Sequence, residues 1–440
     1  MEIHKQKICI IGLGYIGLPA AAMFASNGYQ VVGVDINNKV IDALKKGEVI
    51  IEEPYLKNIV QQEVISGNLT ASKEPQKADV FIIAVPTPLT KDKNADMSFV
   101  KKATESIIPY LKKGNIVVLE STSPTGTVKN IMIPILKKSG LKIGEELYIG
   151  YCPERVLPGQ ILFELVNNNR VIGGVNRKSA EKIKYLYQTF VKGEIYLTDT
   201  TTAEICKIVE NTFRDVNIAF ANELSKICEN TGTDVWEVIK LCNKHPRVNI
   251  HKPGPGVGGH CIAVDPWFIV EKSPEFARII KLARETNDSM PQFIFNKIEN
   301  ILKNVKGIKK VTILGITYKA NIDDTRESPI IGLIEILEKH NYKISAIDPY
   351  VKKFRYKVET VTKAVKESDL LVLAVNHKDF EEIDFDTLAK KMRNQIILDT
   401  RNYFNKNIVE SKGFKYYLLG KANECFKKNF TIYTKLAAVI

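Results

Sequence analysis

The chain has 440 residues, 45% of them hydrophobic and 26% charged, and it carries a formal net charge of +13. This length exceeds what one hydrophobic core usually holds, so we expect two or three domains. The sequence has no apolar run of about eighteen residues and its start does not follow the signal-peptide pattern, which predicts a cytoplasmic protein without membrane partners. The lysines are spread in short pairs, which argues against nucleic-acid binding but favours attraction of anionic nucleotides. Seven cysteines without metal-ligand spacing indicate reduced thiols and no metal site.

The first predicted element is a short strand, residues 7–11, that leads into a glycine-rich turn. The turn reads G-x-G-x-x-G from Gly12 onward and precedes an alanine-rich helix. Glycines at this spacing suit a tight turn, close approach of a pyrophosphate and close helix packing, so the pattern predicts a dinucleotide site. The predicted cofactor contacts within the turn are Gly12, Gly14, Tyr15, Ile16 and Gly17.

A second predicted strand, residues 30–34, ends in Asp35. An acidic side chain at this point accepts hydrogen bonds from the adenosine ribose and repels a 2′-phosphate. We therefore expect NAD rather than NADP as the cofactor, with Lys39 as a further contact.

Two later strands end in polar turns. Residues 79–85 lead into a Pro-Thr-Pro turn at Thr87, and residues 116–119 lead into a Glu-Ser-Thr turn at Thr122. Ligands collect at the carboxyl ends of strands in a parallel sheet, so both threonines are candidates to contact the cofactor. The alternative for each is a hydroxyl that satisfies local backbone groups.

A long helix is predicted for residues 200–232, followed by a second helical stretch at 235–243. Polar residues three or four apart share one stripe of the long helix. They are Glu204, Lys207, Asn211 and Arg214. Because the rest of the helix is apolar enough to be buried, Lys207 needs a partner charge or a reaction to serve, and Asn211 lies one turn on. The alternative is a purely structural pair.

Residues 253–267 read PGPGVGGHCIAVDPW, which places Cys261 after a loop of four glycines and two prolines. Glycines permit close backbone approach to a ligand, and prolines stiffen the loop that presents the sulfur. If a helix begins at Cys261, its dipole favours the thiolate and Asp265 lies one turn on along the same face. Cys261 is therefore the candidate nucleophile, against the alternative of a small buried apolar cysteine.

The strand pattern of the N-terminal part recurs near the C-terminus. Apolar strands are predicted at 311–314 and 344–347, a stretch at 368–375 echoes 78–85, and one at 394–400 echoes 115–121. The repeat predicts a second doubly wound domain whose glycine fingerprint is reduced to Gly315, so it should bind a different nucleotide. There Lys319, Arg326 and Arg401 are candidates to hold phosphate charge, against the alternative of a solvated basic loop.

Together these patterns predict an α/β chain with two Rossmann-like doubly wound domains, joined by a long central helix and a small helical domain. We expect a cofactor-binding domain at 1–199, a central helical domain at 200–305 and a second nucleotide-binding domain at 306–440. Charged stretches at 303–310 and 351–357 are the candidate linkers or loops.

The combined motifs resemble the UDP-glucose/GDP-mannose dehydrogenase family along nearly the whole chain. The shared stretches are the glycine turn at Gly12, Val85-Pro-Thr-Pro88, Glu120-Ser-Thr-Ser-Pro-Thr-Gly126, Cys152-Pro-Glu-Arg155, Lys207-x-x-x-Asn211, the Gly-Gly-His-Cys261 loop and Arg326-Glu-Ser-Pro329. Within the family, four stretches are similar to the branch that oxidises UDP-N-acetyl-D-mannosamine: residues 152–159, 213–220, 245–251 and 254–268.

The resemblance implies an NAD-dependent enzyme that oxidises the C6 alcohol of a nucleotide sugar to a carboxylate, a four-electron reaction that reduces two NAD. It implies that Cys261 attacks the intermediate aldehyde to give a thiohemiacetal and then a thioester. Lys207 and Asn211 would stabilise the alkoxide or oxyanion. The expected product is a uronic acid for surface polysaccharide or glycoprotein.

For cleavage of the thioester, the resemblance assigns the water to Asp265, proton transfer to Glu154, and positioning of water or nicotinamide to Thr122. The UDP-glucose branch has a second glutamate four residues after Glu154, where this chain has Pro158. A role that rests on that second acid does not transfer to this chain.

The resemblance also supplies candidates for contacts with a UDP-sugar. They are Arg155, Val156, Lys207, Asn211, Arg214, His245, Arg247, Gly256, Tyr318, Lys319 and Arg401, while Arg326 is assigned to the cofactor. In the family an arginine that matches Arg247 reaches into the partner subunit's site. We therefore expect a homo-oligomer, a dimer built on the central helix or a tetramer.

Three alternatives remain open at this point. UDP-N-acetylglucosamine or UDP-glucose is an alternative substrate, because epimers at C2 present the same acetamido group and differ only in its direction. A two-electron dehydrogenase of the hydroxy-acid type would use a helix lysine and asparagine, but it needs neither Cys261 nor the second nucleotide-binding domain. A nucleotide-sugar sensor would bind without turnover, and its behaviour would not depend on Cys261.

Overall fold

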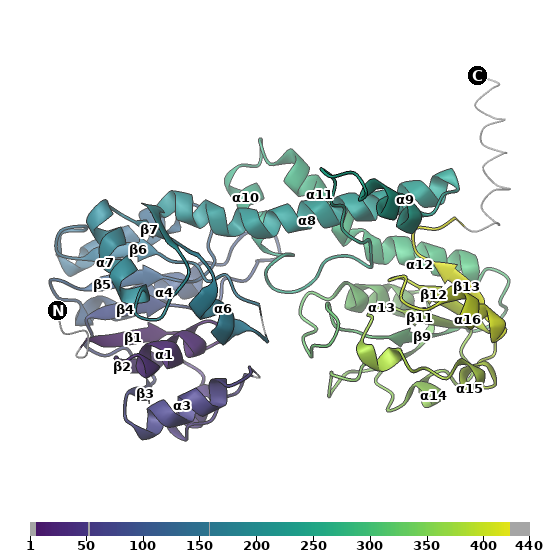
Figure 1. Cartoon of the computed structure of the whole chain (residues 1–440), viewed down its shortest axis with the longest axis horizontal. Coiled ribbons are helices and arrows are strands. Elements are labelled where there is room, and N and C mark those ends of the chain that lie inside the picture. The colour runs from purple at the N-terminus through teal and green to yellow at the C-terminus, as the bar shows by residue number, and fades with distance from the viewer. Residues whose placement is uncertain (1–5, 52, 158, 423–440) are drawn as a thin grey trace. The chain divides into compact units, whose positions relative to one another are not determined.

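The computed structural model describes residues 6–51, 53–157 and 159–422 (Figure 1). It divides into two compact units, Met1–Glu210 with Trp267–Phe276, and Asn211–Pro266 with Ala277–Ile440. The division into three domains at residues 199 and 305 follows the sequence pattern rather than compactness, and it remains our proposal.

The first unit is built on one eight-stranded sheet. Its strands are β1 (Lys7–Ile11), β2 (Gln30–Val34), β3 (Leu69–Ser72), β4 (Val80–Ile83), β5 (Ile116–Leu119), β6 (Tyr148–Tyr151), β7 (Arg170–Gly174) and β8 (Ile195–Asp199). They lie in the order β3-β2-β1-β4-β5-β6-β7-β8, and the pairs are parallel except β6 with β7. The first six strands have the order of a dinucleotide-binding Rossmann fold. Strands β2 and β3 lie on one side of β1, and β4, β5 and β6 lie on the other, so the strand order switches between β1 and β4.

Helices cover both faces of this sheet, and the strand side chains alternate between them. The helices are α1 (Gly17–Ser26), α2 (Asn38–Lys45), α3 (Leu56–Ile65), α4 (Ser98–Ile107), α5 (Ile133–Leu136), α6 (Ile161–Asn167) and α7 (Arg177–Tyr187), with a π-helical turn η3 (Val128–Met132) before α5. Ile8 and Ile10 of β1 lie in the core that contains α1, while Cys9 and Ile11 lie in the core that contains η3. This burial on both faces explains why the strands read as continuous apolar runs.

The second unit contains the predicted second doubly wound sheet. Its strands are β9 (Lys310–Leu314), β10 (Lys343–Ile347), β11 (Leu370–Leu373), β12 (Ile396–Asp399) and β13 (Lys415–Leu418). They are all parallel, in the order β10-β9-β11-β12-β13. The helices around it are α12 (Met290–Ile301), α13 (Pro329–Lys339), α14 (Val361–Ala364), α15 (Phe385–Ala389) and α16 (Lys406–Ser411). The predicted fold class is therefore confirmed.

The long helix α8 spans Thr200–Thr231, followed by α9 (Val235–Cys242), α10 (Asp265–Lys272) and α11 (Arg278–Asp288). The predicted helices at 200–232 and 235–243 are confirmed to within one residue. Neither glycine nor proline occurs within α8, and Gly232 ends it with φ +83° while the N–H of Thr233 donates to the carbonyl of Cys228. In the part of the chain that the structure describes, no helix is both long and apolar enough to cross a membrane.

Candidate active site

The glycine turn between β1 and α1 has the shape that a dinucleotide needs. The N–H of Gly12 donates to the carbonyl of Val34 at 2.8 Å, which closes the turn onto β2. A Cβ on Gly17 would lie 1.8 Å from the carbonyl oxygen of Gly12, so only glycine permits this approach of helix and strand. A Cβ on Gly14, in contrast, would meet nothing within 4 Å. The middle glycine therefore leaves an open face for a ligand.

The N-terminus of α1 faces this turn without a charge of its own. Its N-cap, Ile16, makes no side-chain cap hydrogen bond, and the first turn contains no acidic residue. The preceding Tyr15 is half-buried. In the first turn the N–H of Leu18 donates to the carbonyl of Gly14 at 3.2 Å and Pro19 has no N–H, so the positive end of the helix dipole is what favours a phosphate there.

Asp35 follows β2 and is half-buried. Its Oδ2 accepts the N–H of Leu13 at 3.0 Å, and its Oδ1 accepts the N–H of Asn37 at 2.8 Å. A carboxylate has about four acceptor positions, so Asp35 retains capacity for the hydroxyls of a ribose. Lys39 is exposed in the first turn of α2.

The two threonines predicted at strand ends are joined to each other. The hydroxyl of Thr87 donates to the carbonyl of Thr122 at 2.6 Å, and both residues are half-buried. The loop that carries Thr122 is also tied to α8, because Glu204 accepts the N–H groups of Gly126 at 2.5 Å and Val128 at 2.8 Å. Burial raises the pKa of Glu204 to about 7, against the effect of these two amides. Glu204 thus belongs to the support of this loop rather than to a solvated stripe.

Glu154 lies in a buried cluster behind the carboxyl end of β6. Its Oε2 accepts Arg170 Nη2 at 2.8 Å, and its Oε1 accepts the N–H of Arg155 at 2.7 Å. Glu120 completes the cluster by accepting the hydroxyl of Tyr187, and burial raises its pKa to about 7. Val156, a predicted substrate contact, is half-buried. Pro158, where the chain departs from the UDP-glucose branch, lies outside the described residues.

Arg155 is engaged by the protein itself. Its Nε donates to Glu210 Oε2 at 3.0 Å, and its Nη1 donates to the carbonyl of Asn169 at 3.0 Å. The guanidinium therefore spans from α8 to the start of β7. As a predicted substrate contact, Arg155 would have to share these partners with a ligand.

The predicted pair on α8, Lys207 and Asn211, is less exposed than the arginine one turn further on. Lys207 and Asn211 are both half-buried, one turn apart, while Arg214 is exposed. Asn211 Nδ2 donates to Asp265 Oδ2 at 2.6 Å, and the carboxylate of Asp265 is only 2% exposed. Asn211 and Asp265, to which the family resemblance assigns the oxyanion and the water, therefore lie in direct contact.

Cys261 lies in the turn that leads into α10, four residues before the regular helix begins. Cys261 is half-buried in a turn, and its carbonyl accepts the N–H groups of Val264 at 3.0 Å and Asp265 at 2.8 Å. The regular helix α10 begins at Asp265. Pro266 has no N–H to donate back to Ile262, so it is tolerated only in the first turn of a helix. The condition for the dipole argument, a regular helix that begins at Cys261, is therefore not met.

The loop before Cys261 packs against the segment that follows β9 and against a strand-end arginine. A Cβ on Gly258 would lie 2.5 Å from the carbonyl oxygen of Glu327 and 2.6 Å from the Cβ of Tyr318, so this position has room only for glycine. The N–H of Gly259 donates to the carbonyl of Arg326 at 3.0 Å. The loop and the predicted phosphate-binding segment thus form one packed substructure of the second unit.

The cationic side chains of this substructure differ in their environments. Arg401 Nε donates to the carbonyl of Ala374 at 3.1 Å, and a Cβ on Gly254 would lie 2.4 Å from its guanidinium. Burial lowers the pKa of Arg401 to about 10, which a bound anion would reverse. Lys319 is exposed, and Arg326 is exposed and paired with Asp324 at 2.7 Å. His245 and Arg247 are exposed on the segment after α9.

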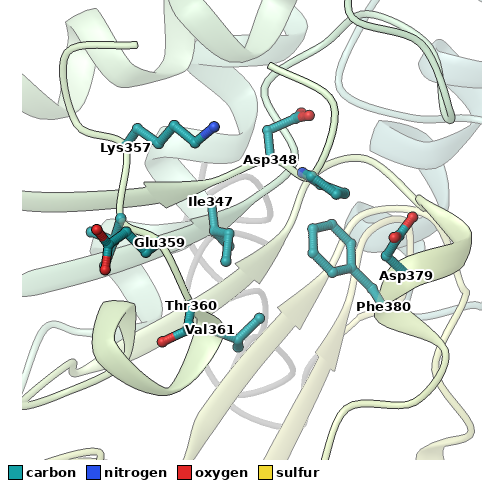
Figure 2. A pocket seen from close by; sticks show the side chains of 10 residues that line it. Ile347, Asp348, Lys357, Glu359, Thr360, Val361, Asp379 and Phe380 are labelled. Carbon is teal, nitrogen blue, oxygen red and sulfur yellow. The ribbon is translucent and has the colours of Figure 1, made fainter. Parts of the chain in front are cut away.

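A cavity of about 320 Å³ lies at the carboxyl end of β10 in the second sheet. Figure 2 shows Asp379 and Phe380, from the short helix η5 (Lys378–Phe380), on one side of it and Thr360 with Val361 on the other. Its position relative to β10 matches that of the Asp35 site relative to β2. Asp348 is the acid at this strand end.

Asp348 does not have the acceptor positions that Asp35 retains for the hydroxyls of a ribose. Its Oδ2 accepts the N–H of Ile316 at 2.8 Å and lies 3.0 Å from His377 Nε2, while its Oδ1 accepts the N–H groups of Tyr350 and Val351. Burial raises the pKa of Asp348, but the hydrogen bonds from His377 and Ile316 outweigh it and hold the pKa below its usual range. A carboxylate with its acceptor positions filled is not available to ribose hydroxyls. The second sheet therefore lacks the NAD-type ribose contact.

Sequence reasoning missed the polar residues that continue the stripe of α8. Asp215 and Asn222 are both 0% exposed, and their spacing from Asn211 places them on the same face of α8. This spacing could have indicated that both residues belong to the stripe. Arg170 and Arg284 carried no such signal, because a single arginine in a strand or an amphipathic helix is usually a surface residue.

Comparison with family models places three successive domains on the chain. The NAD binding domain of the UDP-glucose/GDP-mannose dehydrogenase family matches residues 6–191, its central domain matches 201–289, and its UDP binding domain matches 312–406. The first match contains the glycine turn and Asp35, which confirms the predicted NAD cofactor. The third match contains β10, β11 and β12 of the second sheet, which supports a UDP-sugar as substrate.

Individual relatives cover nearly the whole chain. A UDP-N-acetyl-D-mannosamine dehydrogenase from Methanocaldococcus jannaschii is 51% identical over 421 residues, which are 94% of this chain and 96% of the relative. A solved UDP-D-ManNAc dehydrogenase from Pyrococcus horikoshii aligns with a TM-score of 0.89 at 39% identity, covering 94% of this chain and 99% of that one. The UDP-N-acetyl-mannosamine dehydrogenase of S. aureus aligns with a TM-score of 0.86 at 47% identity and the same coverage.

The family match covers most strands of both sheets and the long helix α8, and the sequence identity far exceeds what a shared fold alone would require. The predicted motifs at the glycine turn, on α8 and in the cysteine loop lie within it. The protein is an NAD-dependent nucleotide-sugar dehydrogenase, and the chain belongs to the UDP-glucose/GDP-mannose dehydrogenase family.

Proposed function

We propose that this enzyme oxidises UDP-N-acetyl-D-mannosamine at C6 to UDP-N-acetyl-D-mannosaminuronate and reduces two NAD in the process. The names of the relatives support the choice of sugar. The observation that carries the chemistry is the cysteine loop: a half-buried thiol in a tightly packed turn, four residues before a carboxylate that Asn211 contacts at 2.6 Å. A two-electron alcohol dehydrogenase has no use for a thiol presented in this way.

In the first oxidation, the C6 alcohol loses a proton and a hydride and becomes an aldehyde. The glycine turn and Asp35 would hold NAD, which would serve as the hydride acceptor in both oxidations. Lys207 stabilises the developing alkoxide by its charge, and the second N–H of the Asn211 amide is available as a further donor. The side chains of α8 thus act on the oxygen atom rather than on the carbon.

In the second oxidation, the thiolate of Cys261 adds to the aldehyde carbon and forms a thiohemiacetal. This tetrahedral carbon has a hydride to give, and the loss of that hydride leaves a thioester on Cys261. Water then cleaves the carbon–sulfur bond, which releases the carboxylate and the free thiol. Asp265 orients this water and Glu154 takes its proton, with Thr122 positioning water or nicotinamide; each oxygen of Glu154 keeps a second lone pair for that contact.

The charged segment of the second unit is the proposed site for the diphosphate and the sugar. Arg401 and Lys319 supply positive charge, and Tyr318 packs against the loop at Gly258. Gly256 brings the backbone of the loop to the ligand. Further contacts come from Arg155, Val156, Arg214, His245 and Arg247, with Arg326 directed to the cofactor.

The proposed substrate is tested by measuring initial rates with UDP-N-acetylmannosamine, UDP-N-acetylglucosamine and UDP-glucose in parallel, with NAD in excess. We expect UDP-N-acetylmannosamine to react fastest. The epimers differ only in the direction of the acetamido group at C2, and that direction decides whether the group meets the side chains that bind it. We also expect two NADH for each sugar consumed. Activity on UDP-glucose alone contradicts the choice of sugar, one NADH per sugar indicates a two-electron dehydrogenase, and binding without any NADH indicates a sensor.

We further propose that the active form is a homo-oligomer, with α8 at the interface between copies. Phe213, Phe220 and Ile227 are spaced seven residues apart on this helix and are 65%, 52% and 48% exposed. Residues at this spacing share one face, so α8 presents an apolar stripe of the kind that packs against another helix. On α11, Ile279 and Leu282 are exposed as well.

The oligomer is tested by introducing a charge into the stripe. We expect Phe220→Lys to reduce the mass measured by analytical ultracentrifugation from a dimer or tetramer to a single chain, because two lysines would face each other in an apolar interface. Phe163→Lys is the matched control, since Phe163 is 68% exposed on α6, outside the stripe. A single-chain mass for the unmodified protein, or an unchanged mass for Phe220→Lys, is incompatible with this interface.

A further inference from the structure

A buried polar network lies directly behind the start of the cysteine loop. It consists of Asp215 and Asn222 on α8 and of Arg284 and Asn287 on α11. The four residues are 0% or 1% exposed. Polar side chains at this depth need partners within the protein.

The hydrogen bonds of this network form a chain in which each group donates to the next, from the backbone of Gly254 to the carboxylate of Asp215. The N–H of Gly254 donates to Asn222 Oδ1 at 2.9 Å, and Asn222 Nδ2 donates to Asn287 Oδ1 at 2.8 Å. Asn287 Nδ2 donates to Asp215 Oδ1 at 2.8 Å, and Arg284 Nη1 donates to the same oxygen at 2.5 Å. A backbone amide only donates and a carboxylate only accepts, so each asparagine amide has one permitted orientation.

The same helix α11 supports the loop at a second point. A Cβ on Gly256 would lie 2.9 Å from the carbonyl oxygen of Asn287, so the loop rests directly on the backbone of α11 there. Asn287 therefore touches the loop at Gly256 and, through Asn222, holds its start at Gly254. Cys261 follows Gly256 by five residues in the same chain segment.

We propose that Asn222 and Asn287, held in place by Asp215 and Arg284, are positioning residues for Cys261. This inference rests on the function proposed above, in which the thiol attacks the aldehyde carbon. The network fixes the beginning of the loop and thereby the position of the sulfur at its end. Displacing a reacting group by about 1 Å costs on the order of 100-fold in rate.

Stability alone does not account for these four residues. Burial raises the pKa of Asp215, while Arg284 acts in the opposite direction. Within the described part of the chain, Asp215 Oδ2 and Arg284 Nε are buried without a hydrogen-bond partner. Replacing a buried ion pair of this kind by apolar residues is often neutral or stabilising. A positional role explains why charged and polar groups occupy this site.

The test is Asn222→Ala, which removes both the acceptor for Gly254 and the donor to Asn287. We expect kcat for acid formation to fall by on the order of 100-fold, with little change in KM for the UDP-sugar. We also expect the aldehyde to accumulate, so that fewer than two NADH form per sugar consumed. Asn222→Ser, which retains a small polar side chain but is too short to reach Gly254, should change both quantities in the same direction.

Thr312→Val is the matched control, because Thr312 is equally buried and hydrogen-bonded in β9 but takes no part in the loop. It should keep the ratio of two NADH per sugar. A second measurement follows the alkylation of Cys261 by iodoacetamide, site by site, in the folded proteins. We expect its rate to change in both Asn222 variants and to stay the same in Thr312→Val.

The outcomes separate this inference from the proposed function. If the unmodified enzyme does not form two NADH per sugar, the proposed function itself fails. If it does, and an Asn222 variant keeps the ratio, kcat and Cys261 alkylation rate of the unmodified enzyme, only the positioning role is refuted. If Asn222→Ala does not fold, Asn222→Ser decides between the two results by the same measurements.

Discussion

Replacing Cys261 by serine is expected to abolish formation of the uronic acid. An aldehyde has no hydride to transfer until a nucleophile adds to it, and a serine hydroxyl at neutral pH adds far less readily than a thiolate. Loss of a covalent nucleophile lowers kcat by on the order of 10⁴-fold or more. The acid and NADH should be measured together in a single incubation with NAD in excess.

The first oxidation does not need the thiol, so Cys261→Ser should still bind the UDP-sugar and convert a fraction of it to the aldehyde. Cys242→Ser is the matched control, because Cys242 is an exposed cysteine at the end of α9 and should be replaceable without loss. Acid formation within tenfold of the unmodified rate in Cys261→Ser would rule out the covalent route. Loss of UDP-sugar binding would indicate that the cysteine supports the fold of the loop.

Replacing Lys207 by methionine is expected to lower kcat by on the order of 10²- to 10³-fold, the effect of removing one donor to an oxyanion. Methionine retains the length and most of the volume of lysine, so the packing of the half-buried side chain on α8 is preserved. The charge acts on an oxygen that becomes negative only during the reaction. KM for the UDP-sugar should therefore change much less than kcat.

Lys226→Met provides the control on the same helix. Lys226 is also half-buried, but its Nζ donates to Ser289 Oγ at 2.7 Å and has no place in the proposed reaction. Its replacement should leave kcat close to that of the unmodified enzyme. Equal losses in both variants, or a rise in KM alone for Lys207→Met, would mean that Lys207 binds substrate uniformly or supports the helix.

The fold could be predicted from local patterns because each pattern has a direct structural cause. The apolar runs before Gly12 and Gly315 are strands buried on both faces, and such strands need no alternation of polar and apolar residues. The 32 residues of α8 contain no helix breaker, and Gly232 marks its end. The acid at residue 35 follows the second strand, where the Rossmann fold requires it.

The parts that could not be predicted depend on contacts between distant segments. Glu204 caps the loop at Gly126, and Asn222 holds Gly254, but neither pairing follows from the position of these residues on α8. The start of α10 at Asp265 agrees with Pro266 in its first turn, because a proline lacks the N–H that a later position would need. Burial of a polar residue becomes interpretable only when the residue that satisfies it is known.

The imidazole of His377 against Asp348 has a consequence for an enzyme that carries two sheets of similar design. Each sheet has an aspartate after its second strand, Asp35 after β2 and Asp348 after β10. A carboxylate with acceptor positions left there can bind the ribose of adenosine. At Asp348 the acceptor positions are filled by His377 together with the backbone N–H groups of Ile316, Tyr350 and Val351, so this strand end does not offer a carboxylate to the ribose of a dinucleotide. Of the two acids, Asp35 alone keeps acceptor positions for a ribose, which leaves the second sheet to a nucleotide bound through other contacts.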